Sequence, residues 1–349
     1  MADERLPAHW RAAGTAVAIG GAILFVWSIR AAGAQSVIEG VGRLGSGFVV
    51  VALLGGLRYV ARTAAWRLCV DTPADLPYAR AFAAFVAGDA LGNVTPFGLL
   101  ISEPSKIALV GSRVPTGAAV AALATENLFY SATVVAMLVV GTAALLLWFS
   151  VSESIRVAGI ATLLGAIAAA LAAAWTVVTR KRLASGAAVR LAKAGIGRRF
   201  LAAHVIHVRE VEDRIFGFAR LHGDRMIPIL SLEIAFHTLA VFEIWFVLSS
   251  ITGTAPTFMT AFVLEYVNRA ITTVFQFVPM WLGVDEAGTG AVAASLNLGA
   301  ATGVSLALAR KARIACWTAI GILLLLYRTH RAAPATAAVA ARHADVRES

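Results

Sequence analysis

Long apolar runs, each bounded by short polar or charged stretches, follow one another along most of the chain. Several of these runs reach about 20 residues, the length that an α-helix needs to cross the roughly 30 Å of hydrocarbon in a bilayer. The pattern therefore predicts an all-α polytopic membrane protein. Runs that are long enough to span lie near residues 14–29, 45–61, 117–148, 157–178, 227–250 and 302–327.

Two further apolar regions, near residues 81–112 and 258–299, are interrupted in the same way. The first contains NVTPFGLLISEPSKIALV and the second QFVPMWLGVDEAGTGAVA, and in each a Pro precedes a Glu by seven residues with a Gly between them. Pro and Gly break a helix, and the freed backbone groups must be satisfied by protein or by a water-filled cavity at membrane depth. A matched pair of broken segments predicts a transporter binding site. The Pro and Glu residues are Pro96, Glu103, Pro279 and Glu286.

The distribution of positive charge orients the predicted helices. Residues 180–225, the tail from Arg328 and the connection from Arg58 to Arg80 are basic, which is typical of cytoplasmic segments. The stretches at 150–155 and 251–257 carry little positive charge and are expected on the opposite side. These constraints predict cytoplasmic termini, about six spanning helices, and two re-entrant helical hairpins that enter from opposite faces as an inverted repeat.

The repeat divides the chain into a first unit, residues 1–150, and a second unit, residues 151–330. Each unit is expected to contain two helices, a re-entrant hairpin and one further helix, with a basic cytoplasmic loop at 179–225 in the second unit. Residues 200–221 have the apolar spacing of an amphipathic helix. This helix lies either on the cytoplasmic leaflet or as a solvated extension of the next spanning helix. Residues 331–349 are expected to form a disordered tail.

Composition supports the membrane prediction and excludes other classes. The chain is 59% hydrophobic and 14% charged, with a mean hydropathy of +0.78. The formal net charge of +10 is therefore read as a topology signal and not as a nucleic-acid footprint. The only cysteines, Cys69 and Cys316, have no metal-type spacing, and no metal or cofactor is expected.

Ionisable side chains within spanning segments are costly, so they are functional candidates. They cluster after each break, and the spacing from Glu103 to Asn127 equals that from Glu286 to Arg310, at 24 residues. In an inverted repeat these positions converge near the midplane. The candidate substrate-binding residues are Asn93, Pro96, Glu103, Lys106, Glu126, Asn127, Arg269, Pro279, Asp285, Glu286, Arg310 and Arg313.

The chemistry of these residues favours an anionic ligand. Arg310 and Arg313 match a phosphate or another anionic headgroup bidentately. The acids are expected to cap half-helices, pair with the arginines, or accept a proton. The alternative is that Glu103 and Glu286 only cap helices and that the arginines extend to one interface. Glu233 and His237 form an i, i+4 pair on one helix, and a hydrogen bond from this pair to another helix is expected. Glu265 and Arg269 are also i, i+4, and an ion pair within their own helix is expected.

The stretches GDALGNVTPFGLLISEPSKIALV and VPMWLGVDEAG together resemble the two signatures of the lysylphosphatidylglycerol synthase transmembrane-domain family, also called flippase-like membrane proteins. The resemblance covers nearly all of residues 10–330. It implies an integral membrane fold and a role in moving or supplying lipids or lipid-linked sugars. The C-terminal aminoacyl-transferase domain of some members is not expected here. Ser102 stands where a Gly is common in the family, and Asn127 where an Arg is frequent.

The residues and the resemblance together predict a lipid translocator of the bacterial cytoplasmic membrane that has no catalytic site. Its expected partners are membrane lipids with an anionic headgroup, and nucleic acid is not expected. Two alternatives remain open at this stage. One is a membrane-embedded transferase that acts on a lipid carrier. The other is an accessory subunit of a lipid-synthesis complex, for example for hopanoids, which would contact lipid-biosynthesis enzymes.

Overall fold

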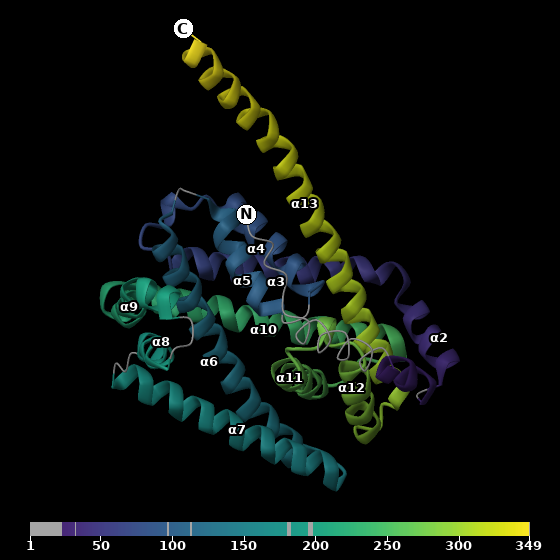
Figure 1. Cartoon of the computed structure of the whole chain (residues 1–349). Helices are drawn as coiled ribbons and strands as arrows, with labels where there is room; N and C mark the ends of the chain where they lie inside the picture. The colour runs from purple at the N-terminus through teal and green to yellow at the C-terminus, as the bar shows by residue number, and fades with distance from the viewer. Residues whose placement is uncertain are drawn as a thin grey trace.

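The computed structural model describes residues 23–31, 33–95, 98–111, 114–179, 183–194 and 198–348, and all regular structure in these ranges is helical (Figure 1). Residues 23–31 form a helix before the labelled elements. The labelled α-helices are α2 (Ala34–Leu44), α3 (Phe48–Leu68), α4 (Tyr78–Asn93), α5 (Gly98–Val110), α6 (Thr116–Trp148), α7 (Glu153–Val178), α8 (Leu183–Lys193), α9 (Arg198–Leu221), α10 (Gly223–Thr252), α11 (Phe258–Val274), α12 (Val284–Ser295) and α13 (Ala300–Glu348).

Four stretches of the described chain are long and apolar enough to cross a membrane. They contain the predicted spans at 45–61, 117–148 and 227–250, and all but the last two residues of the predicted span at 157–178. The predicted span at 302–327 lies in α13 but is not among the four. Of the predicted span at 14–29, residues 14–22 lie outside the described part of the chain. The four stretches are Ala34–Leu68, Thr116–Trp148, Glu153–Thr176 and Gly223–Thr252.

The end of α3 differs from the sequence-based expectation. The stretch from Arg58 to Arg80 was predicted to be a basic cytoplasmic connection. The helix instead continues to Leu68, and Arg58 is buried inside the protein. Because two carboxylate-bearing helices pack around α3, its arginines face inward and are not part of a loop.

Both predicted interruptions are present as breaks between two helices. The α4–α5 contact is close at glycines, since a Cβ atom on Gly92 would lie 2.9 Å from the carbonyl oxygen of Gly98. Between α11 and α12, Pro279 opens a 3₁₀ turn (Pro279–Trp281) in which Met280 has a φ of 50°. Gly283 then adopts a φ of 81°, a conformation that favours glycine, and α12 begins after it. Pro96 lies outside the described residues.

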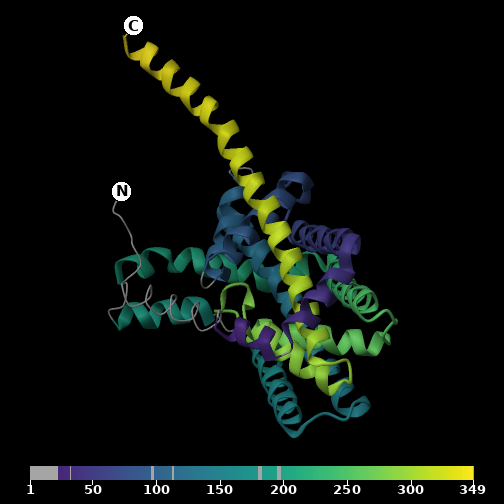
Figure 2. The ribbon, with the colours of Figure 1, turned by 90° about the vertical axis from the view of Figure 1, so that its right-hand side faces the viewer.

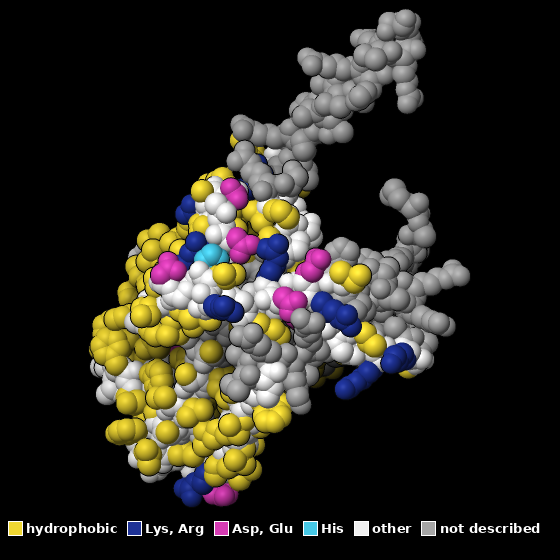
Figure 3. All heavy atoms as spheres, turned by 90° about the vertical axis from the view of Figure 1, so that its left-hand side faces the viewer, with side chains coloured by type: hydrophobic (Ala, Val, Ile, Leu, Met, Phe, Trp, Pro, Cys, Tyr) yellow, Lys and Arg dark blue, Asp and Glu magenta, His cyan; other side chains and the backbone are white. Residues whose placement is uncertain are grey.

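Much of the outer surface is apolar (Figure 3) while many charged side chains lie inside, which is the distribution expected of a protein in lipid. On α7, the exposed side chains include Leu164, Leu171 and Trp175. Figure 3 shows hydrophobic side chains over much of one face, with charged side chains gathered mainly across its upper half. The interior of the described chain contains many buried acids and bases.

The predicted amphipathic segment at 200–221 forms α9, which is a separate helix because α10 begins only after His222. Helix α8 packs along α9, and the Ser185 hydroxyl donates to Glu212 Oε2 at 2.6 Å. Together α8 and α9 project from the side of the helical body, while α13 extends beyond it in another direction (Figure 2). The body that remains, α3 to α6 and α10 to α13, surrounds the charged interior.

Candidate functional site

A cavity of about 1170 Å³ lies between helices of the first and second units. Helices α3, α4, α5 and α6 contribute to its wall from the first unit, and α7 and α10 to α13 contribute from the second. Nine of the predicted site residues line it. Two others, Glu126 and Glu286, are fully buried behind the wall, and Pro96 is outside the described residues. The lining residues are Asn93, Glu103, Lys106, Asn127, Arg269, Pro279, Asp285, Arg310 and Arg313.

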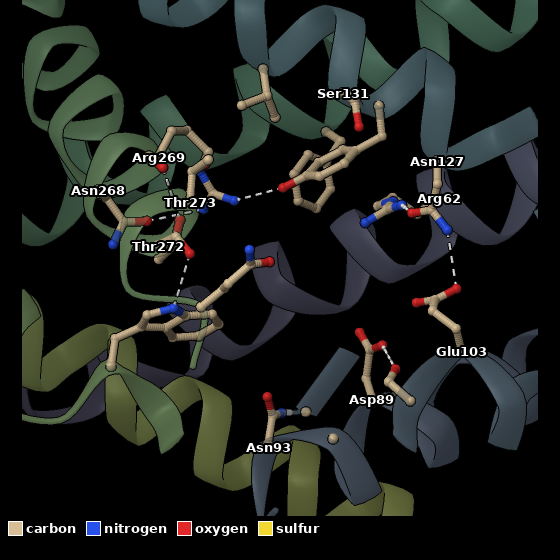
Figure 4. A pocket seen from close by; sticks show the side chains of 18 of the residues that line it. Arg62, Asp89, Asn93, Glu103, Asn127, Ser131, Asn268, Arg269, Thr272 and Thr273 are labelled. Carbon is tan, nitrogen blue, oxygen red and sulfur yellow. Dashed lines mark hydrogen bonds between the residues drawn. The ribbon is translucent and has the colours of Figure 1, made fainter. Parts of the chain in front are cut away.

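The break between α4 and α5 brings one lysine between two acids. Lys106 Nζ lies 2.8 Å from Asp89 Oδ1 and donates to Glu103 Oε1 at 2.9 Å. Its ammonium group also lies 3.9 Å from the centroid of the Phe85 ring, a cation–π contact. The Ser102 hydroxyl donates to Asp89 Oδ1 at 3.0 Å (Figure 4). The first unit therefore presents two carboxylates to the cavity, both already paired with one cation.

Glu103 is also connected to α6. Asn127 Nδ2 donates to Glu103 Oε2 at 3.0 Å, as Figure 4 shows, so the asparagine links α5 to α6. On α4, Asn93 Nδ2 donates to Thr318 Oγ1 of α13 at 3.0 Å. The amides of the two asparagines therefore tie the first broken segment to a helix of each unit.

Arg62 of α3 is held from several sides. Its Nε donates to Glu126 Oε1 at 2.7 Å, and its Nη2 donates to Asn127 Oδ1 at 3.2 Å. Glu233 of α10 lies farther away, with 4.0 Å between its Oε2 and Arg62 Nε. The guanidinium stacks over the Tyr130 ring at 4.0 Å from its centroid. Arg62 thus lines the cavity while it holds a carboxyl group behind the wall.

In the second broken segment, Asp285 pairs with an arginine, which is one of the three roles expected for the acids. Arg310 Nη2 of α13 donates to Asp285 Oδ1 at 2.8 Å and to Thr289 Oγ1 at 2.7 Å. Asn268 Nδ2 of α11 also donates to Asp285 Oδ1, at 3.2 Å. Two other nitrogens of Arg310, Nε and Nη1, have no partner among the described residues. Arg310 therefore retains N–H donors beyond those that its structural pair uses.

Glu286 caps a helix, which is one of the three roles expected for the acids. Its Oε2 accepts the backbone N–H of Gly283 at 2.8 Å, which satisfies a free donor at the start of α12. Its Oε1 lies 2.9 Å from Lys311 Nζ. Because Glu286 is completely buried and does not line the cavity, its contacts position α12 against α13.

One acid in the centre holds two arginines from different units. Glu243 of α10 accepts from Arg58 Nη1 of α3 at 3.0 Å and from Arg313 Nε of α13 at 2.7 Å. All three side chains are buried. A buried carboxylate with two guanidinium partners is fully paired, so this cluster joins α3, α10 and α13 firmly.

Both predicted i, i+4 pairs have a defined place in the structure. Arg269 Nε lies 2.8 Å from Glu265 Oε1, which confirms the internal ion pair, and its Nη1 donates to Tyr130 at 3.1 Å. The other pair was expected to supply a helix–helix hydrogen bond. His237 Nε2 lies 3.1 Å from Thr133 Oγ1 of α6, which is such a bond.

Sequence reasoning missed Arg58 and Arg62, which belong to the centre of the site. Their i, i+4 spacing, with Gly55 and Gly56 one turn before, is the signal for one polar face on a continuing helix. The indole of Trp317 fills the space over Gly56, so α3 and α13 approach closely there. That contact turns the arginine face of α3 toward the cavity.

The described residues contain no group of three His, Cys, Asp or Glu side chains arranged to hold a metal. Cys69 and Cys316 are free thiols, so the disulfide that their number permits is not formed. The arrangement instead offers a cavity in which N–H donors, acids and amides lie among apolar side chains. Such a cavity can bind a polar headgroup out of water while an attached chain stays in lipid.

Comparison with protein families gives one match, to the model described as "Lysylphosphatidylglycerol synthase TM region", over residues 12–321. No match was found among curated proteins or among solved structures. Every helix that lines the cavity lies within the matched range, except that α13 continues beyond residue 321.

Proposed function

The chain belongs to the lysylphosphatidylglycerol synthase transmembrane-region family, and on that premise we propose that it is a lipid translocator that moves a lipid or a lipid-linked polar headgroup between leaflets without altering it chemically. It is a multi-pass integral membrane protein. The observation that carries the proposal is the cavity between the two units, which is lined by both acids and bases. A protein that only anchors a partner needs no such interior, because each buried charge is costly in a membrane.

The cargo that this cavity favours has an anionic headgroup, such as a phosphate. Arg310 lines the cavity and has two nitrogens without a partner among the described residues. These two nitrogens are buried, and because a guanidinium group binds phosphate through its N–H donors, we expect a headgroup that reaches them to bind this side chain. The uncharged amides of Asn93 and Asn127 add donors and acceptors for hydroxyl groups. The acyl part of the cargo remains in the surrounding lipid.

An inverted repeat of two units, with the broken segments as re-entrant hairpins, is supported by how the helices pack. Helix α4 packs on α13, while α11, the first helix of the other broken segment, packs on α6. Helices α3 and α10 pack on each other. Exchange of α3 with α10, α4 with α11, and α6 with α13 leaves this set of contacts unchanged. Rocking of the two units about the α3–α10 contact would expose the cavity to each leaflet in turn.

The membrane and the orientation follow from charge. The basic segment at 179–225 and the basic end of the last helix favour the cytoplasmic side for both, with the termini inside. We infer the bacterial cytoplasmic membrane from the family to which the chain belongs. Loop 179–225 is the surface that lipid-biosynthesis enzymes would contact if the cargo is handed over directly.

The first test is mass spectrometry of the lipids that the gently purified protein retains. We expect one lipid class to be enriched over the bulk membrane in the wild-type protein and lost in Arg310→Gln. The control is Arg156→Gln on α7, because Arg156 is exposed and does not line the cavity. That variant should retain the same lipid as the wild type.

Two results would favour another function. Bulk lipid only, with no difference between the variants, would remove the specific headgroup site and favour an accessory role in a lipid-synthesis complex. Conversion of an added lipid carrier and donor to product by the pure protein would favour a transferase.

A further inference from the structure

Three helices bring two acids and one base together behind the cavity wall. Arg62 comes from α3, Glu126 from α6 and Glu233 from α10. Both glutamate side chains have an exposed fraction of 0%. Arg62 binds Glu126 at 2.6 Å and is 4.0 Å from Glu233, so the guanidinium neutralises one carboxylate well and the other poorly.

The second carboxyl group has no donor of its own. Among the described residues, nothing donates to Oε2 of Glu126 or to either carboxyl oxygen of Glu233. The two carboxyl groups face the same guanidinium group, 2.6 Å and 4.0 Å from its nitrogens. Two buried carboxylates that approach in this way cannot both ionise, and one proton between them supplies the missing donor.

Glu243 provides the contrast within the same protein. That carboxylate has two guanidinium partners, at 3.0 Å and 2.7 Å, and both of its oxygens accept. The central cluster therefore has one acid for two bases, whereas the Arg62 cluster has two acids for one base. Only the second needs a proton to balance its charge.

The other ionisable groups around the pair do not balance the second charge. From α5, Lys106 is already paired with both Asp89 and Glu103. The guanidinium of Arg225, at the start of α10, donates to backbone carbonyl groups at the end of α3. Four other titratable groups lie near the pair. Tyr59 of α3 and Cys69, directly after α3, are neutral. Tyr130 of α6 and His237 of α10 are hydrogen-bonded to other side chains.

We propose that Glu126 and Glu233 hold one proton between them, and that they take up a second proton when an anionic headgroup draws Arg62 into the cavity. This inference rests on the proposed translocator function for its second part only. Arg62 is suited to such a link because it lines the cavity and already contacts the cavity residue Asn127 at 3.2 Å. Loss of Arg62 from Glu126 leaves a buried carboxylate without a cation, which favours its protonation.

The step conserves charge. One carboxylate oxygen forms an O–H bond with a proton from the aqueous side, while the guanidinium moves its positive charge to the headgroup. Before the step, Arg62 balances the one negative charge of the glutamate pair; after it, the doubly protonated pair is neutral and Arg62 neutralises the headgroup. The headgroup and the proton then cross together, so a proton gradient drives an anionic lipid in the direction in which protons flow.

The proton itself is tested without any transport assay. In infrared spectra of the purified wild-type protein near pH 8, exposed carboxyl groups are ionised, so a carbonyl band of protonated carboxylic acid reports a buried one. We expect this band in the wild type, its loss in both Glu233→Gln and Glu126→Gln, and its retention in Glu243→Gln. A wild type without the band, or a band that survives in both former variants, overturns the shared proton.

The coupling is tested in liposomes with fluorescent phosphatidylglycerol as the probe and an imposed pH gradient. One gradient makes the liposome interior acidic, and the other makes it alkaline. We expect the two gradients to change the rate of lipid movement in opposite directions. The difference should vanish in Glu233→Gln and persist in Glu153→Gln, an exposed site on α7. Lipid movement that ignores the gradient overturns the coupling. If the wild type moves no lipid at all, the translocator proposal fails, and the infrared band alone decides whether the proton site exists.

Discussion

Glu126 and Glu233 lie on different helices, α6 and α10, and face the same guanidinium group, with Arg62 nitrogens 2.6 Å from the first and 4.0 Å from the second. This relationship joins the two units at a point where a cavity residue also controls the charge behind the wall. The Arg62 cluster has two acids for one base, and the Glu243 cluster has one acid for two bases. The two clusters therefore differ in their balance of charge and not in their number of ion pairs. The predictions below use that balance.

Neutralising Glu243 should destabilise the protein much more than neutralising Glu233. In Glu243→Gln, two buried guanidinium groups lose their carboxylate, which costs about 3–5 kcal/mol. In Glu233→Gln, the new amide can donate to Glu126, and the cost should stay below about 1 kcal/mol. Thermal unfolding of both variants in the same detergent measures the difference. Equal unfolding temperatures for the two variants would mean that the clusters do not differ in charge balance.

Removing Arg62 should be costly, and removing its two acids as well should restore much of the loss. Arg62→Ala leaves two buried carboxyl groups without any cation, and we expect a loss of about 3–5 kcal/mol. A triple variant, Arg62→Met with Glu126→Gln and Glu233→Gln, has no buried charge in this cluster. Its unfolding temperature should lie closer to that of the wild type than to that of Arg62→Ala. An equally unstable triple variant would show that packing, and not charge, holds these helices together.

The contact between α12 and α13 depends on Gly303. A Cβ atom there would lie 2.5 Å from the carbonyl oxygen of Thr289 and 2.7 Å from the Ala293 Cβ. Gly303→Ala should therefore destabilise the protein by about 1–3 kcal/mol, as overpacking does. It should also displace the Thr289 hydroxyl from Arg310, and so weaken lipid retention.

The matched control is Gly42→Ala on α2, where a Cβ atom meets nothing within 4 Å. Alanine favours a helix over glycine by up to about 1 kcal/mol, so stability should be unchanged or slightly higher. Thermal unfolding and retained-lipid mass spectrometry of the two variants check the prediction. A Gly303→Ala protein as stable as the control would contradict the close helix contact.

The helices and their breaks were predictable from the sequence because they depend on local chemistry. Apolar runs specify helices of spanning length, and Pro279 with Gly283 ends one helix before the next begins. The spacing placed Glu286 near Arg310, and pairing with an arginine was one of three roles expected for the acids; in the structure Asp285, the neighbour of Glu286, makes that pair. The same spacing placed Asn127 near Glu103, to which it donates a hydrogen bond.

The partners of α3 were not predictable, because they depend on which helices pack around it. Arg58 and Arg62 sit near the end of an apolar run, and a charge at that place is typical of a loop. Only the packing of α6 and α10 on α3 supplies the buried acids that make the arginines part of the site. The assignment of Glu286 as a cap likewise needed the turn at Gly283, which is a property of the folded chain.

The cavity as the lipid path is tested most directly by filling it. Ser131 of α6 lines the cavity, as Figure 4 shows, whereas Val140 does not line it and is 56% exposed. The two residues are nine positions apart, about two and a half helical turns, so they lie on opposite faces of α6. Ser131→Trp fills part of the path, and Val140→Trp adds the same bulk on the outside.

The measurement is the rate at which fluorescent phosphatidylglycerol becomes accessible to a membrane-impermeant quencher in liposomes that contain each protein. We predict that the wild type and Val140→Trp move the lipid faster than protein-free liposomes do. Ser131→Trp should be slower by at least about tenfold, a barrier increase of about 1.4 kcal/mol. Equal rates for Ser131→Trp and Val140→Trp, or a wild type no faster than protein-free liposomes, would contradict the claim that lipid crosses the membrane through this cavity.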